Sequence, residues 1–121
     1  MKIIGIDWGE AKIGLAKSES LLAEPWKVIK PVDLKSILLA EKPDLIIVGV
    51  SENQSGEKAR AFGQELEKIL KIKVKLFDET LSTSEAKIRS REAGIGQKKR
   101  QGMEDAYAAA IFLQNYLDSV Y

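Results

Sequence analysis

The sequence predicts an α/β fold in which a five-stranded mixed sheet carries helices on both faces. Three observations lead to this prediction. Two apolar, strand-like runs near the amino terminus are joined by a very short connection, which implies an antiparallel hairpin. The later segment "DLIIVGV" is apolar without alternation, as in a strand covered on both sides of a parallel sheet. Helical segments separate the later strands, as βαβ units require.

The amino-terminal part is expected to form three antiparallel strands and one helix. Strands are predicted at residues 2–7 and 13–17, on either side of the turn "WGEAK", and a short third strand at residues 26–29. A helix is predicted over residues 33–41, because apolar residues repeat there at helical spacing until the dipeptide "KP" stops it.

The remaining elements are expected to be two parallel strands and three helices. The buried strand covers residues 44–50, and the helix over residues 57–70 is predicted to bury Phe62, Leu66, Ile69 and Leu70. The strand at residues 73–77 alternates apolar residues with lysines, so one face or one edge should meet water. Helices at residues 84–93 and 103–116 are separated by the loop "GIGQKKRQG".

Composition limits the classes of protein that this chain can be. With 121 residues, 45% of them apolar, we expect a single domain over residues 1–121. No apolar run approaches the roughly 20 residues of a membrane span, and no signal-peptide pattern is present, so we expect a soluble, cytoplasmic protein. The chain has no cysteine and no histidine, which excludes Ser/His/Asp and Cys/His triads and the usual zinc sites.

Positive charge is concentrated in one segment, although the net charge of the whole chain is only +1. Residues 87–100 contain six basic side chains against the single acid Glu92. Such a segment suits the phosphate backbone of a nucleic acid, but a solvated helix face followed by a surface loop explains it equally well.

Three positions carry acids that this topology would gather: Asp7 at the end of the first strand, Asp78 or Glu79 after the last, and Glu104 or Asp105 at the start of the final helix. Hard oxygen ligands without histidine or cysteine select Mg²⁺ or Mn²⁺. Two such ions roughly 4 Å apart can hydrolyse a phosphodiester without an imidazole base.

Each acid alone also fits a structural role. Asp7 could end its strand in a turn, the acids at 78 and 79 could begin a solvated loop, and those at 104 and 105 could complement the helix dipole. Strand alternation and helical spacing do not by themselves choose between the members of each adjacent pair.

Four segments, in order and over nearly the whole chain, resemble the YqgF or RuvX-like family. They are "IIGIDWGEAKIGLA", "KPDLIIVGV", "DETLSTSEA" and "DAYAAAIFLQNYL". Members of this family have a ribonuclease H-like fold and are described as Holliday-junction resolvases and as nucleases that mature pre-16S ribosomal RNA. The resemblance implies an Asp, Glu, Asp metal site, which maps onto Asp7, Glu79 and Asp105.

The chain departs from the family pattern at two positions. Thr80 stands where the family usually has an arginine after the glutamate, and Ser51 stands where it usually has a proline. Loss of that arginine is expected to weaken a phosphate contact, and Lys87 or Arg89 is expected to compensate.

The resulting hypothesis is a metal-dependent nuclease acting on structured RNA or branched DNA, as a monomer or a homodimer. Asp7, Glu79 and Asp105 are its catalytic metal ligands, with Mg²⁺ or Mn²⁺ as cofactor, and Gly9 and Gly14 allow the backbone to turn and the substrate to approach closely. The residues expected to contact nucleic acid are Thr83, Lys87, Arg89, Lys98, Lys99 and Arg100.

Two other classes share some of these features. A nucleic-acid-binding module without catalysis would keep the basic segment but would not need the three acids. An actin-like or sugar-kinase ATPase also begins with a strand that ends in Asp and Gly before a hairpin. That fold needs two such domains to enclose ATP, however, and the sequence contains no second Asp-Gly hairpin.

Overall fold

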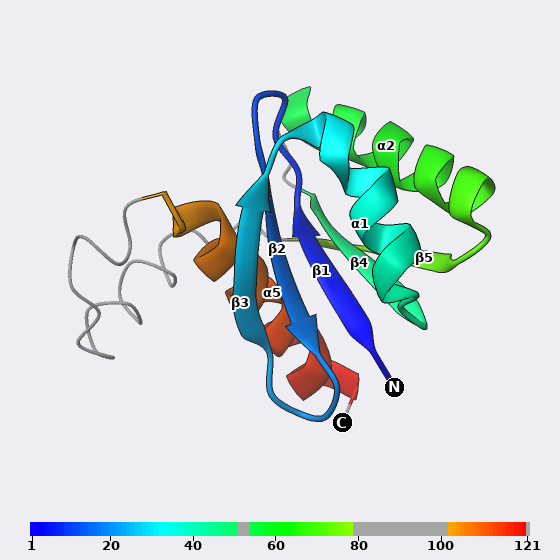
Figure 1. Ribbon diagram of the computed structural model, residues 1–121. Helices are drawn as coiled ribbons and strands as arrows, with labels where there is room; N and C mark the ends of the chain where they lie inside the picture. Colours follow the sequence, from blue (N-terminus) through cyan, green and yellow to red (C-terminus); the bar gives the residue numbers. More distant parts are fainter. Residues whose placement is uncertain (51–53, 79–101, 121) are drawn as a thin grey trace.

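The computed structural model describes residues 1–50, 54–78 and 102–120, which form one sheet with helices on both faces (Figure 1). The strands are β1 (Ile3–Asp7), β2 (Ile13–Ser18), β3 (Glu24–Ile29), β4 (Leu45–Val50) and β5 (Lys73–Asp78). The helices are a 3-10 turn, η1 (Pro31–Asp33), followed by α1 (Leu34–Glu41), α2 (Gln54–Leu70) and α5 (Glu104–Val120).

The sheet has the strand order β3-β2-β1-β4-β5. β2 pairs antiparallel with both β1 and β3, whereas β1, β4 and β5 run parallel. This confirms the predicted mixed sheet. β4 is internal, as its continuous apolar sequence indicates, and β5 is an edge strand whose Leu76 is 40% exposed.

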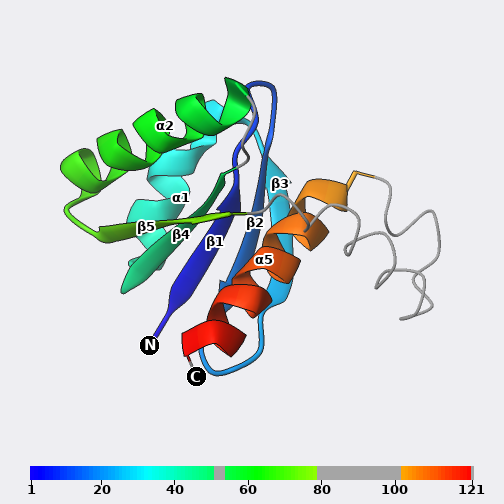
Figure 2. The same ribbon diagram turned by 180° about the vertical axis from the view of Figure 1, so that it is seen from behind.

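Alternation along the strands divides the core into two layers. Ile4 and Ile6 of β1 pack with buried residues of α1 and α2, such as Leu38 and Leu66. Ile3 faces the other way and packs against α5. Figure 2 shows α5 crossing this second face and running antiparallel to β1, so that α5 starts near the carboxyl end of β1.

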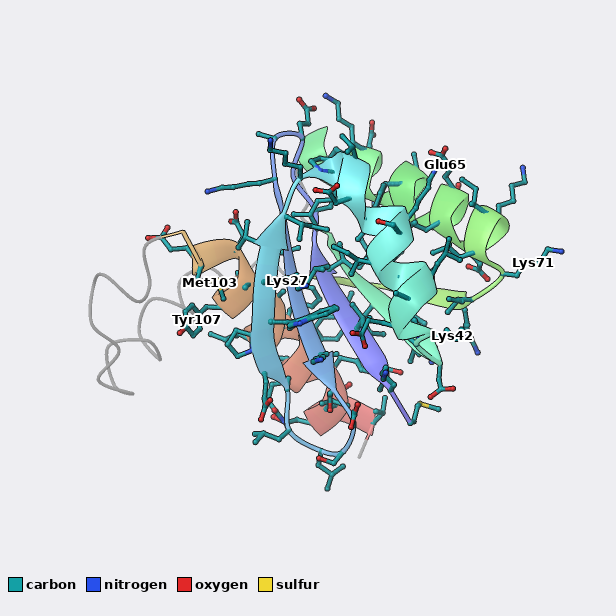
Figure 3. All side chains as sticks on the ribbon, in the orientation of Figure 1. Lys27, Lys42, Glu65, Lys71, Met103 and Tyr107 are labelled. Carbon is teal, nitrogen blue, oxygen red and sulfur yellow. The ribbon has the colours of Figure 1, made fainter. Side chains whose placement is uncertain are left out.

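The two helices of the first layer end in the same way. Lys42 and Lys71 take left-handed backbone conformations, with φ of 51° and 56°. Their N–H groups donate to the carbonyls of Leu38 and Glu67, each at 3.0 Å, which closes the last turn of each helix. Both lysines are labelled in Figure 3, where they lie at the ends of α1 and α2.

One predicted core position is wrong. Ile69 of α2 is 47% exposed, and the buried stripe of the helix instead passes through Ala59, Phe62, Gly63 and Leu66. A step of three residues from Leu66 would reach Ile69, but the stripe continues through the partly buried Leu70 and leaves Ile69 outside its edge.

Some predictions concern residues that the structure does not describe. The expected helix at 84–93 and most of the loop that follows it lie outside the described residues. Among the helices that are described, none combines the length and the apolar character needed to cross a membrane.

Candidate active site

Asp7 ends β1 on the face of the sheet that α5 covers. Ile3 belongs to the apolar cluster beneath α5, and a Cβ added to Gly5 would lie 3.1 Å from the Cβ of Leu113. Because side chains alternate along a strand, Asp7 has the same orientation as Ile3 and Gly5. The Asp7 side chain is partly buried and comes one position after the end of the apolar run.

Gly14 brings the start of α5 next to Asp7. The residue pairs directly with Asp7 in the antiparallel ladder between β1 and β2. A Cβ on Gly14 would lie 2.1 Å from the backbone oxygen of Asp105. The helix backbone therefore rests on the strand at this point, and Gly14 lies within β2 rather than in the turn. What approaches it closely is the backbone of α5.

Asp7 and Asp105 consequently lie at the same end and on the same face of the sheet, each next to Gly14. The Asp105 side chain is 33% exposed, whereas its neighbour Glu104 is exposed. In the pair of acids at the start of α5, Asp105 is thus the one turned toward the sheet. Met103 and Tyr107, labelled in Figure 3, mark this end of the helix.

The third predicted acid, Glu79, lies outside the described residues, but the strand that leads to it is described. β1, β4 and β5 are in register, with Asp7, Gly49 and Phe77 side by side, so their carboxyl ends meet at one edge. Phe77 faces α5, because its ring packs edge-on against Tyr116 with centroids 6.0 Å apart.

The turn between β1 and β2 is held in place from several directions. A Cβ on Gly9 would be 2.7 Å from the Lys12 carbonyl oxygen, so the turn is too tight there for a side chain. Trp8 packs against Phe62 of α2, with ring centroids 5.8 Å apart. Glu10 forms an ion pair with Lys58 of α2, which holds the pKa of the Glu10 carboxyl below its ordinary value.

Lys12, in the same turn, reaches toward α5. Its Nζ lies 3.6 Å from Oδ2 of Asp105. Sequence reasoning missed this residue because lysines in turns are usually solvated. The available signal was its position, between the strand that ends in Asp7 and the strand that carries Gly14.

The two acids fit a divalent metal, since carboxylate oxygens are the ligands that Mg²⁺ and Mn²⁺ prefer. Residues 1–50, 54–78 and 102–120 contain no group of three or more metal-binding side chains, and the third predicted ligand is not among them. The predicted nucleic-acid contacts also lie outside the described residues; these are Thr83, Lys87, Arg89, Lys98, Lys99 and Arg100.

Similar solved structures identify the fold. The fowlpox virus Holliday junction resolvase aligns with a TM-score of 0.67 at 14% identity and covers 100% of both chains. A T. thermophilus RuvC in complex with Holliday junction substrate aligns with a TM-score of 0.62 at 16% identity, covering 99% of this chain and 95% of that one. At these identities the likeness establishes the ribonuclease H-like fold alone.

Sequence comparison identifies the family. A family model described as RuvX, Holliday junction resolvase, matches residues 1–119. One relative is a protein of Anaeromyxobacter sp. (strain Fw109-5) named "Putative pre-16S rRNA nuclease". It is 40% identical, and the match covers 98% of this chain and 97% of that protein. A relative of the same name from Halothermothrix orenii is 38% identical, and the match covers 98% of this chain and 95% of that protein.

The fold, together with relatives that are named as nucleases, defines a class of protein, the nucleases of ribonuclease H-like fold. Within that class, the chain belongs to the RuvX family. The fold and family expected from the sequence are both confirmed.

Proposed function

We propose that this protein is a cytoplasmic, Mg²⁺- or Mn²⁺-dependent nuclease that hydrolyses phosphodiester bonds in structured nucleic acid. The observation that carries the proposal is the convergence of Asp7 and Asp105 beside Gly14, on the α5 face and at the carboxyl edge of the parallel strands. Ligands of open α/β sheets bind at this edge.

Glu79 is the proposed third ligand, and the described part of β5 supports choosing it over Asp78. Phe77 faces α5, whereas Leu76 faces α2, where its side chain approaches Gly63. Glu79 comes two residues after Phe77, and Asp78 comes two residues after Leu76. Side chains two residues apart in a strand point to the same face. Continued alternation would therefore direct the carboxylate of Glu79, and not that of Asp78, to the face that carries Asp7.

The chain contributes rigid support for the carboxylates. Asp7 is held by a strand paired on both sides, and Asp105 by a helix that rests on β2 without an intervening side chain. A divalent cation, when bound, supplies an activated water and neutralises charge on the phosphate. Supports of this rigidity keep the ligands in fixed positions, as such chemistry requires.

The names of relatives support two substrates. Relatives named for pre-16S rRNA support precursor ribosomal RNA, and the family description supports branched DNA. We propose that Thr83, Lys87, Arg89, Lys98, Lys99 and Arg100 contact the phosphate backbone of either. Trimming one RNA end requires a single site, whereas symmetric cutting of a junction requires a homodimer.

A cleavage assay tests the proposal. Labelled precursor 16S rRNA and a four-way DNA junction are incubated with Mg²⁺, with Mn²⁺ or with EDTA. We expect cutting of at least one substrate in either metal and none in EDTA. Asp7→Asn, Glu79→Gln and Asp105→Asn should each lower the rate by at least about a hundredfold, because each removes a metal ligand.

The adjacent acids provide matched controls. Asp78→Asn and Glu104→Gln change the same charge one residue away and should retain most of the activity. Cutting that survives Asp7→Asn would refute the metal site. Tight binding without cutting in either metal would favour the binding module without catalysis, and ATP hydrolysis would favour the kinase-like class.

A further inference from the structure

We propose that Lys12 is a substrate-contacting residue of this site, whose ammonium binds a phosphate oxygen of the nucleic acid next to Asp105. The inference rests on the proposed nuclease function. It arises from the ion pair between Lys12 and Asp105 and from the way the surrounding turn is anchored.

The ammonium of Lys12 is held loosely. Its distance of 3.6 Å from Asp105 exceeds the roughly 2.7–2.9 Å of a charge-assisted hydrogen bond. The Lys12 side chain is 60% exposed, and ion pairs this exposed contribute little to stability. Stabilisation of the fold is therefore a weak reason for a lysine at this position, and the ammonium can exchange one oxygen anion for another.

The backbone beneath Lys12 is, by contrast, firmly placed. Trp8 and Glu10 attach the turn to α2, and Ile13 begins a buried strand immediately after Lys12. The backbone of the turn is therefore held in place, while the exposed Lys12 side chain carries its ammonium at the edge where Asp7 and Asp105 lie. A positioned cation on a flexible stem suits contact with a phosphate, which accepts hydrogen bonds from many directions.

The negative charge of the acids at this site explains why a cation is needed beside them. Two carboxylates repel an approaching phosphodiester, so cations are needed beside them for the substrate to bind. Lys58, which also reaches this turn, is paired with Glu10.

Lys12→Met and Lys58→Met form a matched pair, because both lysines are 60% exposed and both pair with an acid. Binding of a labelled precursor 16S rRNA fragment is measured by fluorescence anisotropy in EDTA between 50 and 300 mM salt. We expect Lys12→Met to weaken binding about five- to tenfold at 0.1 M salt and to lower the slope of log K against log salt by about 1. Lys58→Met should change neither.

Cleavage kinetics in Mn²⁺ provide a second measurement. Lys12→Met should raise KM more than it lowers kcat, and Lys12→Arg should restore most of the wild-type KM, since arginine also binds phosphate. An unchanged KM together with an unchanged salt slope in Lys12→Met would overturn the inference. So would tighter Mn²⁺ binding in that variant without any loss of RNA affinity, because Lys12 would then only neutralise Asp105.

Failure of this inference is distinct from failure of the proposed function. If the wild-type protein cuts nothing in either metal, the nuclease proposal fails. The anisotropy measurement still tests the phosphate contact of Lys12 in that case, since it needs neither metal nor cutting.

Discussion

At the scale of single residues, Lys2 joins the start of β1 to the end of α1. Its Nζ donates to the Glu41 carboxylate and to the Glu41 carbonyl, each at 3.1 Å. Its backbone N–H donates to Asp44 at 2.8 Å. The hydrogen bond from Lys2 lowers the pKa of the Glu41 carboxyl below its ordinary value, with a further contribution from the charge of Lys17.

This lowered pKa makes a small part of the stability depend on pH. A carboxyl group whose pKa is lower in the folded state stabilises the fold above its unfolded pKa of about 4.5, and that stabilisation is lost as the pH falls through the folded value. Glu41→Gln should therefore lower the free energy of unfolding at pH 7 by up to about 1 kcal/mol. Urea denaturation at pH 7 and at pH 3 measures this, and the difference should be smaller at pH 3.

Glu67→Gln, which changes an exposed glutamate of α2, is the control and should have little effect at either pH. An equal loss of stability from Glu41→Gln at both pH values would show that the charge of Glu41 is not responsible.

At the scale of elements, the contact between α5 and the sheet determines the geometry of the site. Gly5 and Gly14 leave room for the backbone of α5, whose oxygen atoms at Ala109 and Asp105 would approach a Cβ at these positions to 3.4 and 2.1 Å. The contact at Gly14 is the closer one and involves backbone, which cannot rotate out of the way. The first turn of α5, with Asp105, is thus positioned by the absence of a side chain on β2.

Gly14→Ala should consequently destabilise the protein by about 3 kcal/mol or more, because the whole start of α5 must move to admit a methyl group. Gly5→Ala is the matched variant, and it should cost less, about 1–2 kcal/mol, because its nearest neighbour is the Leu113 side chain at 3.1 Å. Urea denaturation gives both values. The cleavage rate of folded Gly14→Ala should also fall further than that of Gly5→Ala.

Equal costs for the two glycine variants would contradict the proposed role of Gly14 in seating the helix. An active Gly14→Ala protein of normal stability would show in addition that α5 does not need this contact to present Asp105.

The elements themselves were largely predictable. The uniform apolar sequence of β4 and the alternation in β5 each indicate local burial, and the structure confirms both strands. The error at Ile69 has a physical reason: helical spacing finds the direction of an apolar stripe, but the partner surface decides how wide the stripe is. In α2 that surface is narrow enough to leave Ile69 in water.

At the scale of the whole molecule, strand order gathers acids that are far apart in the sequence. β1 lies in the middle of the sheet, with β2 on one side and β4 on the other, and α5 crosses over β1 and β2. Asp7 and Asp105, which are far apart in the sequence, therefore lie at the same end and on the same face of the sheet. Their like charges favour binding of a cation between them.

Metal binding should stabilise the folded protein, because the unfolded chain separates the acids. At a Mn²⁺ concentration 100 times the dissociation constant found by titration, we expect a gain of about 2.7 kcal/mol, or a rise in Tm of roughly 10 °C. Asp7→Asn should remove most of this rise. Thermal denaturation followed by circular dichroism, with and without EDTA, measures it.

Asp118→Asn, which alters an exposed acid at the opposite end of α5, is the control and should show the full rise. A rise that persists in Asp7→Asn would place the bound metal elsewhere on the protein.

The organisation of residues 1–121 as a single domain stays a prediction.

The sequence by itself determined the elements, the mixed sheet and the resemblance to the RuvX family, because apolar periodicity and turn residues reflect local geometry. It also identified Asp7 as a candidate, but helical spacing alone favoured Asp105 only slightly over Glu104. The choice between them depends on which side of α5 rests on β2. Tertiary structure decided this through Gly14, whose missing side chain lets the helix backbone settle on the strand and turns Asp105, beside Lys12, toward the end of β1.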